Sequence, residues 1–192
     1  MSDAEPRLPP QRIRTTKLQE AQLAELVEFE RAAMQMYRAE GYTEEHVEAR
    51  DDRAIARLTK NHDVIVAEAD HLTAGYMAWA DQAPGVAVLT QMCIGPEFQR
   101  FGIATRLLRE LGDTASGHGI EYVACIVWPS AAWALSFLAT RGFMPVDQGV
   151  VPEHVAKWCK TAASEVLQDG QIILWRETEH LGHTPGLPKP SN

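Results

Sequence analysis

The spacing of apolar residues along the chain predicts a helical first part followed by strands. From residue 18 to residue 36 apolar side chains recur with an approximately helical period, and Gly41 ends this predicted helix. Residues 43–45, Thr-Glu-Glu, suit the first turn of a second, charged helix that continues over residues 46–58. A short β segment near residues 12–16 precedes both helices.

The remainder of the chain alternates between strand-like and helix-like patterns. Apolar runs separated by turn-prone residues predict a meander of strands at residues 63–69, 74–80 and 86–94. The later patterns predict a helix that ends near residue 116, a strand at 122–127, a helix at 131–140, a helix at 152–166 and a strand at 171–176. This order predicts an α/β fold, built on one mixed sheet with helices on both faces.

Length and composition favour a single domain. The chain has 192 residues, of which 45% are hydrophobic, and its middle contains no internal repeat. Both ends are rich in Pro, Gly and polar residues. We therefore expect a flexible N-terminus at residues 1–11, one domain at 12–176 and a flexible tail at 177–192.

Charge and cysteine content narrow the possible partners and the location. A net charge of −8 argues against a nucleic-acid partner, which would need clustered Lys and Arg. No apolar run approaches the roughly 18 residues of a membrane span and the N-terminus lacks a signal-peptide core, so we expect a cytoplasmic protein without a membrane partner. Cys93, Cys125 and Cys159 suit reduced, small core residues there. His180 and His183 lie in the tail without further ligands, so no metal site is predicted.

The segment at residues 96–108, PEFQRFGIATRLL, turns directly from a loop into an amphipathic helix. Its first turn offers no acidic residue and no obvious Ser or Thr cap, so N–H groups near Arg100, Gly102 and Ala104 have no intrahelical partner. The positive end of the helix dipole favours an anion such as a diphosphate. The alternative is that water caps these groups and Gly102 is an ordinary turn glycine. The segment is neither a Walker loop nor a Rossmann turn.

Gln99-Arg100-Phe101-Gly102-Ile103-Ala104 resembles the Gln/Arg-x-x-Gly-x-Gly/Ala signature of the GNAT superfamily of acyl-CoA-dependent N-acetyltransferases. Residues 133–143 resemble a second family segment, which ends in Tyr-x-x-x-Gly-Phe, and Glu30-Arg31-Ala32-Ala33 with Tyr37 is similar to the first helix of small bacterial members. The resemblance implies a mixed, mostly antiparallel central sheet of about six to seven strands flanked by helices. It also implies a splayed cleft between the fourth and fifth strands.

The resemblance further implies that the cofactor is acetyl-CoA or another acyl-CoA. Its pyrophosphate would lie on the turn, and its pantetheine arm on the main chain of the strand that ends at Ile94. Trp133 and Phe137 would adjoin the cofactor, with core packing as their alternative. The expected cofactor-binding residues are Met92, Cys93, Ile94, Gln99, Arg100, Phe101, Gly102, Ile103, Ala104, Thr105, Trp133 and Phe137.

The chain departs from its relatives where catalysis would take place. Leu138 stands where many members carry a proton-donating Tyr, and Ala134 replaces a common Asn. Gln91 occupies a strand position that is often Glu, and an amide cannot accept a proton as a carboxylate does. The candidate catalytic residues are Glu30, Gln91 and Tyr122, with Tyr37 and Ser130 as further candidates for proton transfer. Each has a structural alternative, which for Glu30 is a surface charge.

The sequence supports transfer of an acetyl group from acetyl-CoA to a primary amine of a small molecule or peptide, by direct attack in a ternary complex. The alternative is an acyl-CoA-binding sensor or scaffold of the same fold with impaired catalysis, and a third reading is an unrelated anion-binding α/β module. Trp158, read as an exposed residue of the last helix, could form a homodimer interface.

Overall fold

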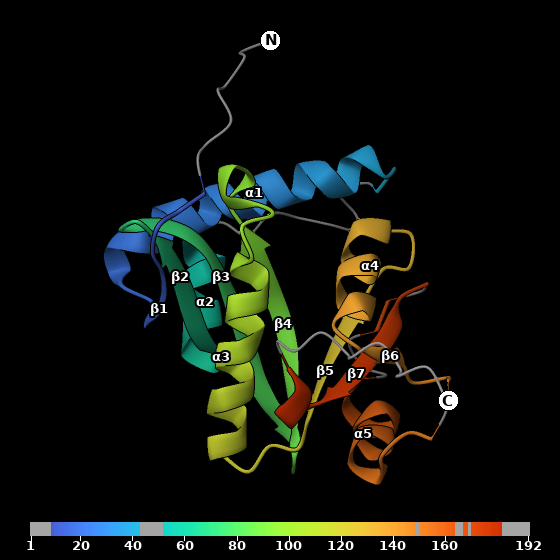
Figure 1. The fold of residues 1–192 in the computed structure, drawn as a ribbon. Helices are drawn as coiled ribbons and strands as arrows, with labels where there is room; N and C mark the ends of the chain where they lie inside the picture. The colour runs from blue at the N-terminus through green and yellow to red at the C-terminus, as the bar shows by residue number, and fades with distance from the viewer. Residues whose placement is uncertain (1–8, 43–51, 149, 164–166, 169, 182–192) are drawn as a thin grey trace, which may run out of the picture.

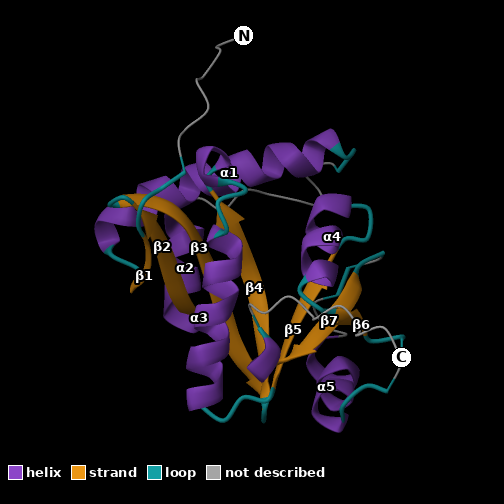
Figure 2. Cartoon of the chain, in the orientation of Figure 1, coloured by secondary structure: helices purple, strands orange, loops and turns teal. Residues whose placement is uncertain are grey.

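The computed structural model describes residues 9–42, 52–148, 150–163, 167–168 and 170–181. Its sheet has seven strands in the order β1-β2-β3-β4-β5-β7-β6 (Figures 1 and 2). The strands are β1 (Ile13–Lys17), β2 (Asp63–Ala69), β3 (Leu72–Ala83), β4 (Val86–Ile94), β5 (Tyr122–Val127), β6 (Met144–Pro145) and β7 (Ile172–Glu177). All neighbouring pairs are antiparallel except β4 and β5, which run parallel. The predicted fold class and mixed sheet are confirmed.

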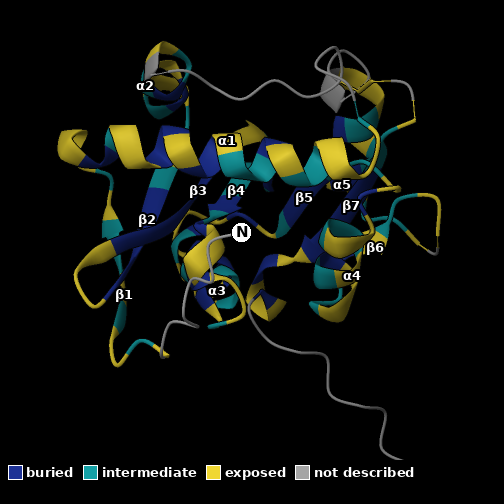
Figure 3. Cartoon of the chain, turned by 90° about the horizontal axis from the view of Figure 1, so that it is seen from above, coloured by how far each residue is buried: buried dark blue, intermediate teal, exposed yellow. Residues whose placement is uncertain are grey.

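Helices cover both faces of this sheet. They are α1 (Leu23–Ala39), α2 (Asp52–Asn61), α3 (Ile103–Gly117), α4 (Ala132–Thr140) and α5 (Glu153–Trp158), the last continued by a π-helical turn at Cys159–Ala163. Figure 3 shows α3 and α4 on one face and α2 and α5 on the other. Helix α1 crosses the end of the sheet where β4 finishes (Figure 1). None of the described helices is long and apolar enough to cross a membrane.

Most predicted elements agree with the structure to within a few residues. Two parts of these predictions, the helix start at 43–51 and residues 164–166 of the last helix, lie outside the described residues. The sequence missed β6, because a strand of only two residues carries no alternating pattern. Residues 177–181, expected to begin a flexible tail, include a 3-10 turn at Thr178–His180, and Leu181 is buried beside Gly112 of α3.

The predicted apolar face of α3 is buried against the sheet. Ile103 is 2% exposed, and Leu107, Leu108, Leu111 and Ala115 have no exposed surface. These side chains pack on residues from β2, β3, β4 and β5, so the helix is held firmly although its first turn lacks a cap. Burial of several such side chains contributes about 1.5–3 kcal/mol each. The start of α3 is therefore fixed in place by the core.

The expectation that Trp158 is exposed is wrong. Its side chain is 2% exposed and packs among apolar residues of β4, β5 and β7. The last helix uses this ring to cover its own sheet, because the apolar face of α5 points inward. Trp158 is therefore not available for a homodimer interface.

Cys125 gives the fold a testable dependence on pH. Burial raises the pKa of its thiol from 9.0 to about 12. The unfolded chain ionises this thiol above its ordinary pKa and the folded chain does not, so the contribution is intact below pH 9 and is lost as the pH rises toward 12. Between pH 8.5 and 10.5 we expect wild-type protein to lose about 2 kcal/mol of unfolding free energy relative to Cys125→Ala, measured by urea denaturation. Parallel curves for the two proteins would contradict this.

Candidate active site

The turn before α3 presents uncapped N–H groups, as the sequence predicts. Arg100 has φ 67° and Gly102 has φ 79°, so both adopt the left-handed conformation. The first helical bond runs from the N–H of Arg106 to the carbonyl of Gly102, over 3.0 Å. Among the described residues, none accepts a hydrogen bond from the N–H groups between Arg100 and Thr105. These donors lie at the positive end of the helix dipole.

The surroundings of the turn suit an anion. A Cβ built on Gly102 would meet no atom within 4 Å, which leaves open space next to the N–H groups. The first turn carries no acidic residue. Arg141, which follows α4, donates from Nη2 to Thr105 Oγ1 over 2.7 Å, and so brings a guanidinium to the same turn. Donors, charge and space therefore fit a phosphate or diphosphate group.

The sheet splays beside this turn. Parallel pairing of β4 and β5 extends from Val86 and Tyr122 to Leu89 and Cys125 and stops there within the described strands. Beyond Leu89 strand β4 keeps its pairs with β3 alone, and a bulge marks the same place on that side. The main chain of Met92, Cys93 and Ile94 therefore lies along the opening between β4 and β5, where its outward N–H and C=O groups can meet a ligand. The expected cleft between the fourth and fifth strands is confirmed.

A buried carboxylate lies at the splay. Glu30 of α1 is 0% exposed, so its alternative reading as a surface charge is wrong. Its Oε1 accepts hydrogen bonds from the Tyr76 hydroxyl, from Gln91 Nε2 over 2.6 Å and from Cys93 Sγ over 3.7 Å. The structure thus joins two of the three predicted catalytic residues. Gln91 is half-buried and stands between this carboxylate and the cleft.

The sequence did not single out Tyr76 as part of this group. It faces Cys93 across the β3–β4 ladder, and both side chains point toward α1. Strand alternation alone places Gln91 and Cys93 on one face, but only the register with β3 brings Tyr76 to them. Arg141 was likewise expected only as part of a motif, not as a partner of Thr105.

The other candidate residues lie in different surroundings. Tyr122 begins β5 at the paired end of the cleft and packs against His154 and Trp175, at ring centroid distances of 6.3 and 6.0 Å. The structure does not bring it to Glu30. Leu138 is 5% exposed and belongs to the core, so α4 offers an apolar side chain at that position. Phe137 packs on the same core, with the Arg141 guanidinium 5.3 Å from its ring centroid.

Tyr37 lies close to the buried carboxylate. Burial raises the pKa of its phenol to about 12, and the neighbouring Cys93, Tyr42 and Glu30 act in the same direction. Tyr37 is therefore a neutral hydroxyl at any physiological pH, able to donate a hydrogen bond. Its ring contacts Trp133 at a centroid distance of 5.3 Å. The preceding residue of α1, Met36, places its Sδ 3.8 Å from Gln99 Nε2.

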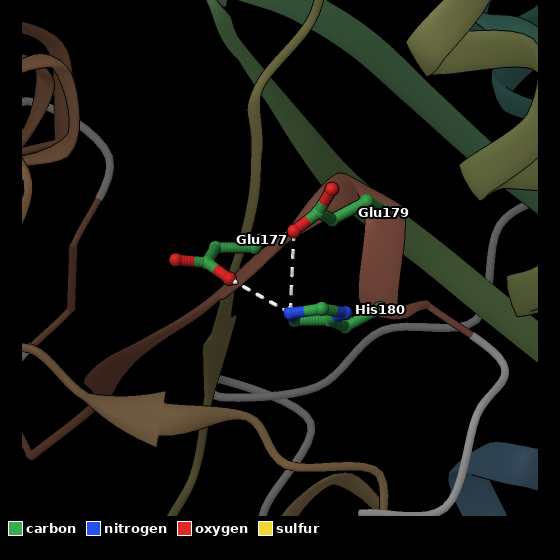
Figure 4. Close-up of side chains that lie close together, drawn as sticks. All are labelled: Glu177, Glu179 and His180. Atoms are coloured by element: carbon green, nitrogen blue, oxygen red, sulfur yellow. Dashed lines mark ion pairs between the residues drawn. The ribbon is translucent and has the colours of Figure 1, made fainter.

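A separate polar group lies at the end of β7. His180 Nε2 is 3.1 Å from Glu177 Oε2 and 3.4 Å from Glu179 Oε1 (Figure 4). All three side chains are exposed, and ion pairing with His180 accounts for their closeness. His183, the other tail histidine, lies outside the described residues.

The fold and the turn define an acyl-CoA-type transferase architecture, and comparison with known proteins identifies the family. Residues 23–143 match the acetyltransferase (GNAT) family. This match spans more than half of the chain, and the chain belongs to the GNAT family of acetyltransferases. The expected cofactor agrees with this, since acetyl-CoA is the acetyl donor of the family. Among curated proteins none matches the chain in sequence.

Solved structures share the fold at low sequence identity. PaiA N-acetyltransferase from Thermoplasma acidophilum, in complex with coenzyme A, is 19% identical over 87% of this chain and 99% of its own, with a TM-score of 0.70. The ribosomal-protein-S18-alanine N-acetyltransferase from Escherichia coli is 17% identical over 87% of this chain and 94% of its own, at a TM-score of 0.62. N-acetylglutamate synthase from Neisseria gonorrhoeae, complexed with coenzyme A and N-acetyl-glutamate, is 19% identical over 86% of this chain and 35% of its own, with a TM-score of 0.62.

Proposed function

We propose that this protein transfers an acetyl group from acetyl-CoA to a primary amine by direct attack in a ternary complex. The observation that carries the proposal is the turn from Arg100 to Gly102, with its unpartnered N–H groups, beside the opening between β4 and β5. One feature binds an anionic cofactor head, and the other receives an extended arm next to a strand edge. A transferase of this kind needs both.

The cofactor supplies an activated thioester, and the chain supplies its placement. The N–H groups from Arg100 to Thr105 would hold the pyrophosphate, with Gln99 at its edge and the Arg141 guanidinium beside Thr105. The main chain of β4 from Met92 to Ile94 would bind the amides of the pantetheine arm. Placing an amine next to this strand supplies much of the rate through proximity and orientation.

Gln91 and Glu30 act together on the incoming amine in this proposal. Gln91 donates to the buried Glu30 carboxylate, which fixes the orientation of its amide. The carbonyl oxygen of the same amide then accepts a hydrogen bond from the amine and aims the nitrogen lone pair. Because Glu30 has no exposed surface, it works through Gln91 as a positioning residue. Its charge strengthens the amide as an acceptor in surroundings of low dielectric constant.

A second candidate function is an acyl-CoA-binding sensor of the same fold. Leu138 favours it, because a buried leucine on α4 offers no proton to a departing thiolate. Tyr37 supplies a neutral hydroxyl near the carboxylate instead, although its raised pKa makes it a weak acid.

Calorimetry tests the shared part of both functions. We expect acetyl-CoA to bind with a dissociation constant well below about 1 mM, and acetate not to bind measurably. Dephospho-CoA, which retains the pyrophosphate, should bind as well. An absence of binding at millimolar acetyl-CoA would remove both functions together. Release of free thiol with a panel of amines then separates enzyme from sensor, because only the enzyme gives amine-dependent turnover.

A further inference from the structure

Four aromatic rings meet at one end of the molecule, and we call them the aromatic cluster: Tyr37, Tyr42, Trp128 and Trp133. Tyr37 contacts Tyr42 at a centroid distance of 5.7 Å and Trp133 at 5.3 Å, both edge to face. Tyr42 contacts Trp128 at 5.1 Å, and its hydroxyl shares a hydrogen bond with Ser130. The rings form a continuous chain from Trp133 to Trp128.

The aromatic cluster stands at the open end of the β4–β5 cleft. Trp128 directly follows β5, and Trp133 lies in the first turn of α4. Tyr37 comes from the last part of α1, which crosses this end of the sheet toward α4 (Figures 1 and 3). Tyr37 also neighbours the buried Glu30 and Cys93, so the rings reach to the candidate catalytic group.

The composition of the aromatic cluster points to an aromatic ligand. None of its rings is fully buried, and Trp133 is 38% exposed. All four members are aromatic, so a second cationic group on a ligand would find no carboxylate among them, and the nearby Glu30 has no exposed surface. A further ring can instead join the same edge-to-face arrangement and bury apolar area.

We propose that the aromatic cluster is the acceptor subsite, and that the preferred acceptor is an arylalkylamine, a primary amine linked through a short alkyl chain to an aromatic ring. The aryl group packs on Trp133 and Tyr37, and the alkyl chain directs the nitrogen toward Gln91. This inference rests on the proposed acetyl transfer. It assigns Trp133 to the acceptor, whereas the sequence resemblance placed it beside the cofactor.

Kinetics with matched amines test the assignment. We expect kcat/KM for 2-phenylethylamine to exceed that for n-butylamine about 10-fold or more, with 1,4-diaminobutane no better than n-butylamine. Equal values for the two monoamines, or a preference for the diamine, would overturn the inference while acetyl transfer itself stands. Loss of turnover with every amine would instead count against the proposed enzyme.

Substitution of Trp133 gives a second readout. Trp133→Leu keeps an apolar side chain and removes the ring, and it should abolish the advantage of 2-phenylethylamine while kcat/KM for n-butylamine changes less than about 3-fold. Calorimetry of 2-phenylethylamine binding to the protein saturated with coenzyme A should show the same loss without relying on turnover. Leu72→Ala, at an exposed apolar residue that begins β3, is the control and should leave both amines unaffected. If Trp133→Leu weakens acetyl-CoA binding instead, the ring belongs to the cofactor site and the inference fails.

Discussion

Gly102→Asp is expected to weaken acetyl-CoA binding at least about 100-fold and to abolish turnover with any amine. The new carboxylate would occupy the open space at the head of α3, where the pyrophosphate is proposed to bind. It would both cap the free N–H groups and repel the phosphates, and two unit charges about 5 Å apart interact by roughly 3 kcal/mol at an effective dielectric constant of 20. Calorimetry with acetyl-CoA measures the effect directly.

Two matched variants separate charge from backbone strain in this test. Gly102→Asn has nearly the same shape and also tolerates the left-handed conformation, so it should bind acetyl-CoA more weakly than wild type but about 100-fold more tightly than Gly102→Asp. Gly119 also has a positive φ, of 74°, and equally open surroundings, at the other end of α3. Gly119→Asp should leave the affinity for acetyl-CoA unchanged. Equal affinities of Gly102→Asp and Gly102→Asn would show that the phosphates bind elsewhere.

The cofactor side of the site could be predicted from sequence because it is local. The turn, the uncapped start of α3 and the apolar face that buries this helix all lie within about one segment of chain, 96–115. Helix periodicity and capping rules apply to such a segment without knowledge of its neighbours. The open space next to Gly102 and the donors from Arg100 to Thr105 agree with that local prediction.

The catalytic side could be predicted only in part because it is assembled from distant segments. Glu30 and Gln91 are 61 positions apart, and Glu30 and Tyr76 are 46 apart. Their contact depends on how α1 packs across β3 and β4 and on the register of those strands, which no local pattern specifies. Burial of Trp158 escaped prediction for the same reason, since an apolar helix face does not reveal whether it packs on its own sheet or on a second copy.

The departure of Gln91 from the family's usual Glu has a structural explanation. The sequence shows an amide where relatives often carry a carboxylate, and the structure places the Glu30 carboxylate 2.6 Å from that amide. The negative charge has therefore moved from the strand to the helix that covers it. Such an exchange keeps one carboxylate and one amide at the splay and changes which of them faces the cleft.

Exchanging these two groups gives the second large effect that we expect. Glu30→Gln should lower kcat about 10- to 100-fold, because Gln91 loses the carboxylate that orients it, with little change in KM for acetyl-CoA. Gln91→Glu should also lower kcat, since two carboxylates at hydrogen-bond distance cannot both be charged. The double variant Glu30→Gln with Gln91→Glu restores one carboxylate and one amide, and it should recover at least about 10-fold of the activity lost in either single variant. Steady-state kinetics across the pH range from about 6 to about 9 measures all three.

The pattern of recovery distinguishes a positioning role from a purely structural one. Glu30→Gln leaves the Tyr76 hydroxyl and the Cys93 thiol with a poorer acceptor, so we expect a loss of about 1–3 kcal/mol in unfolding free energy in any case. Tyr76→Phe removes one of these hydrogen bonds without touching the Glu30–Gln91 pair and serves as the control for that loss. If Tyr76→Phe lowers kcat as much as Glu30→Gln does, or if the double variant regains stability without regaining turnover, Glu30 supports the fold and does not orient the amine.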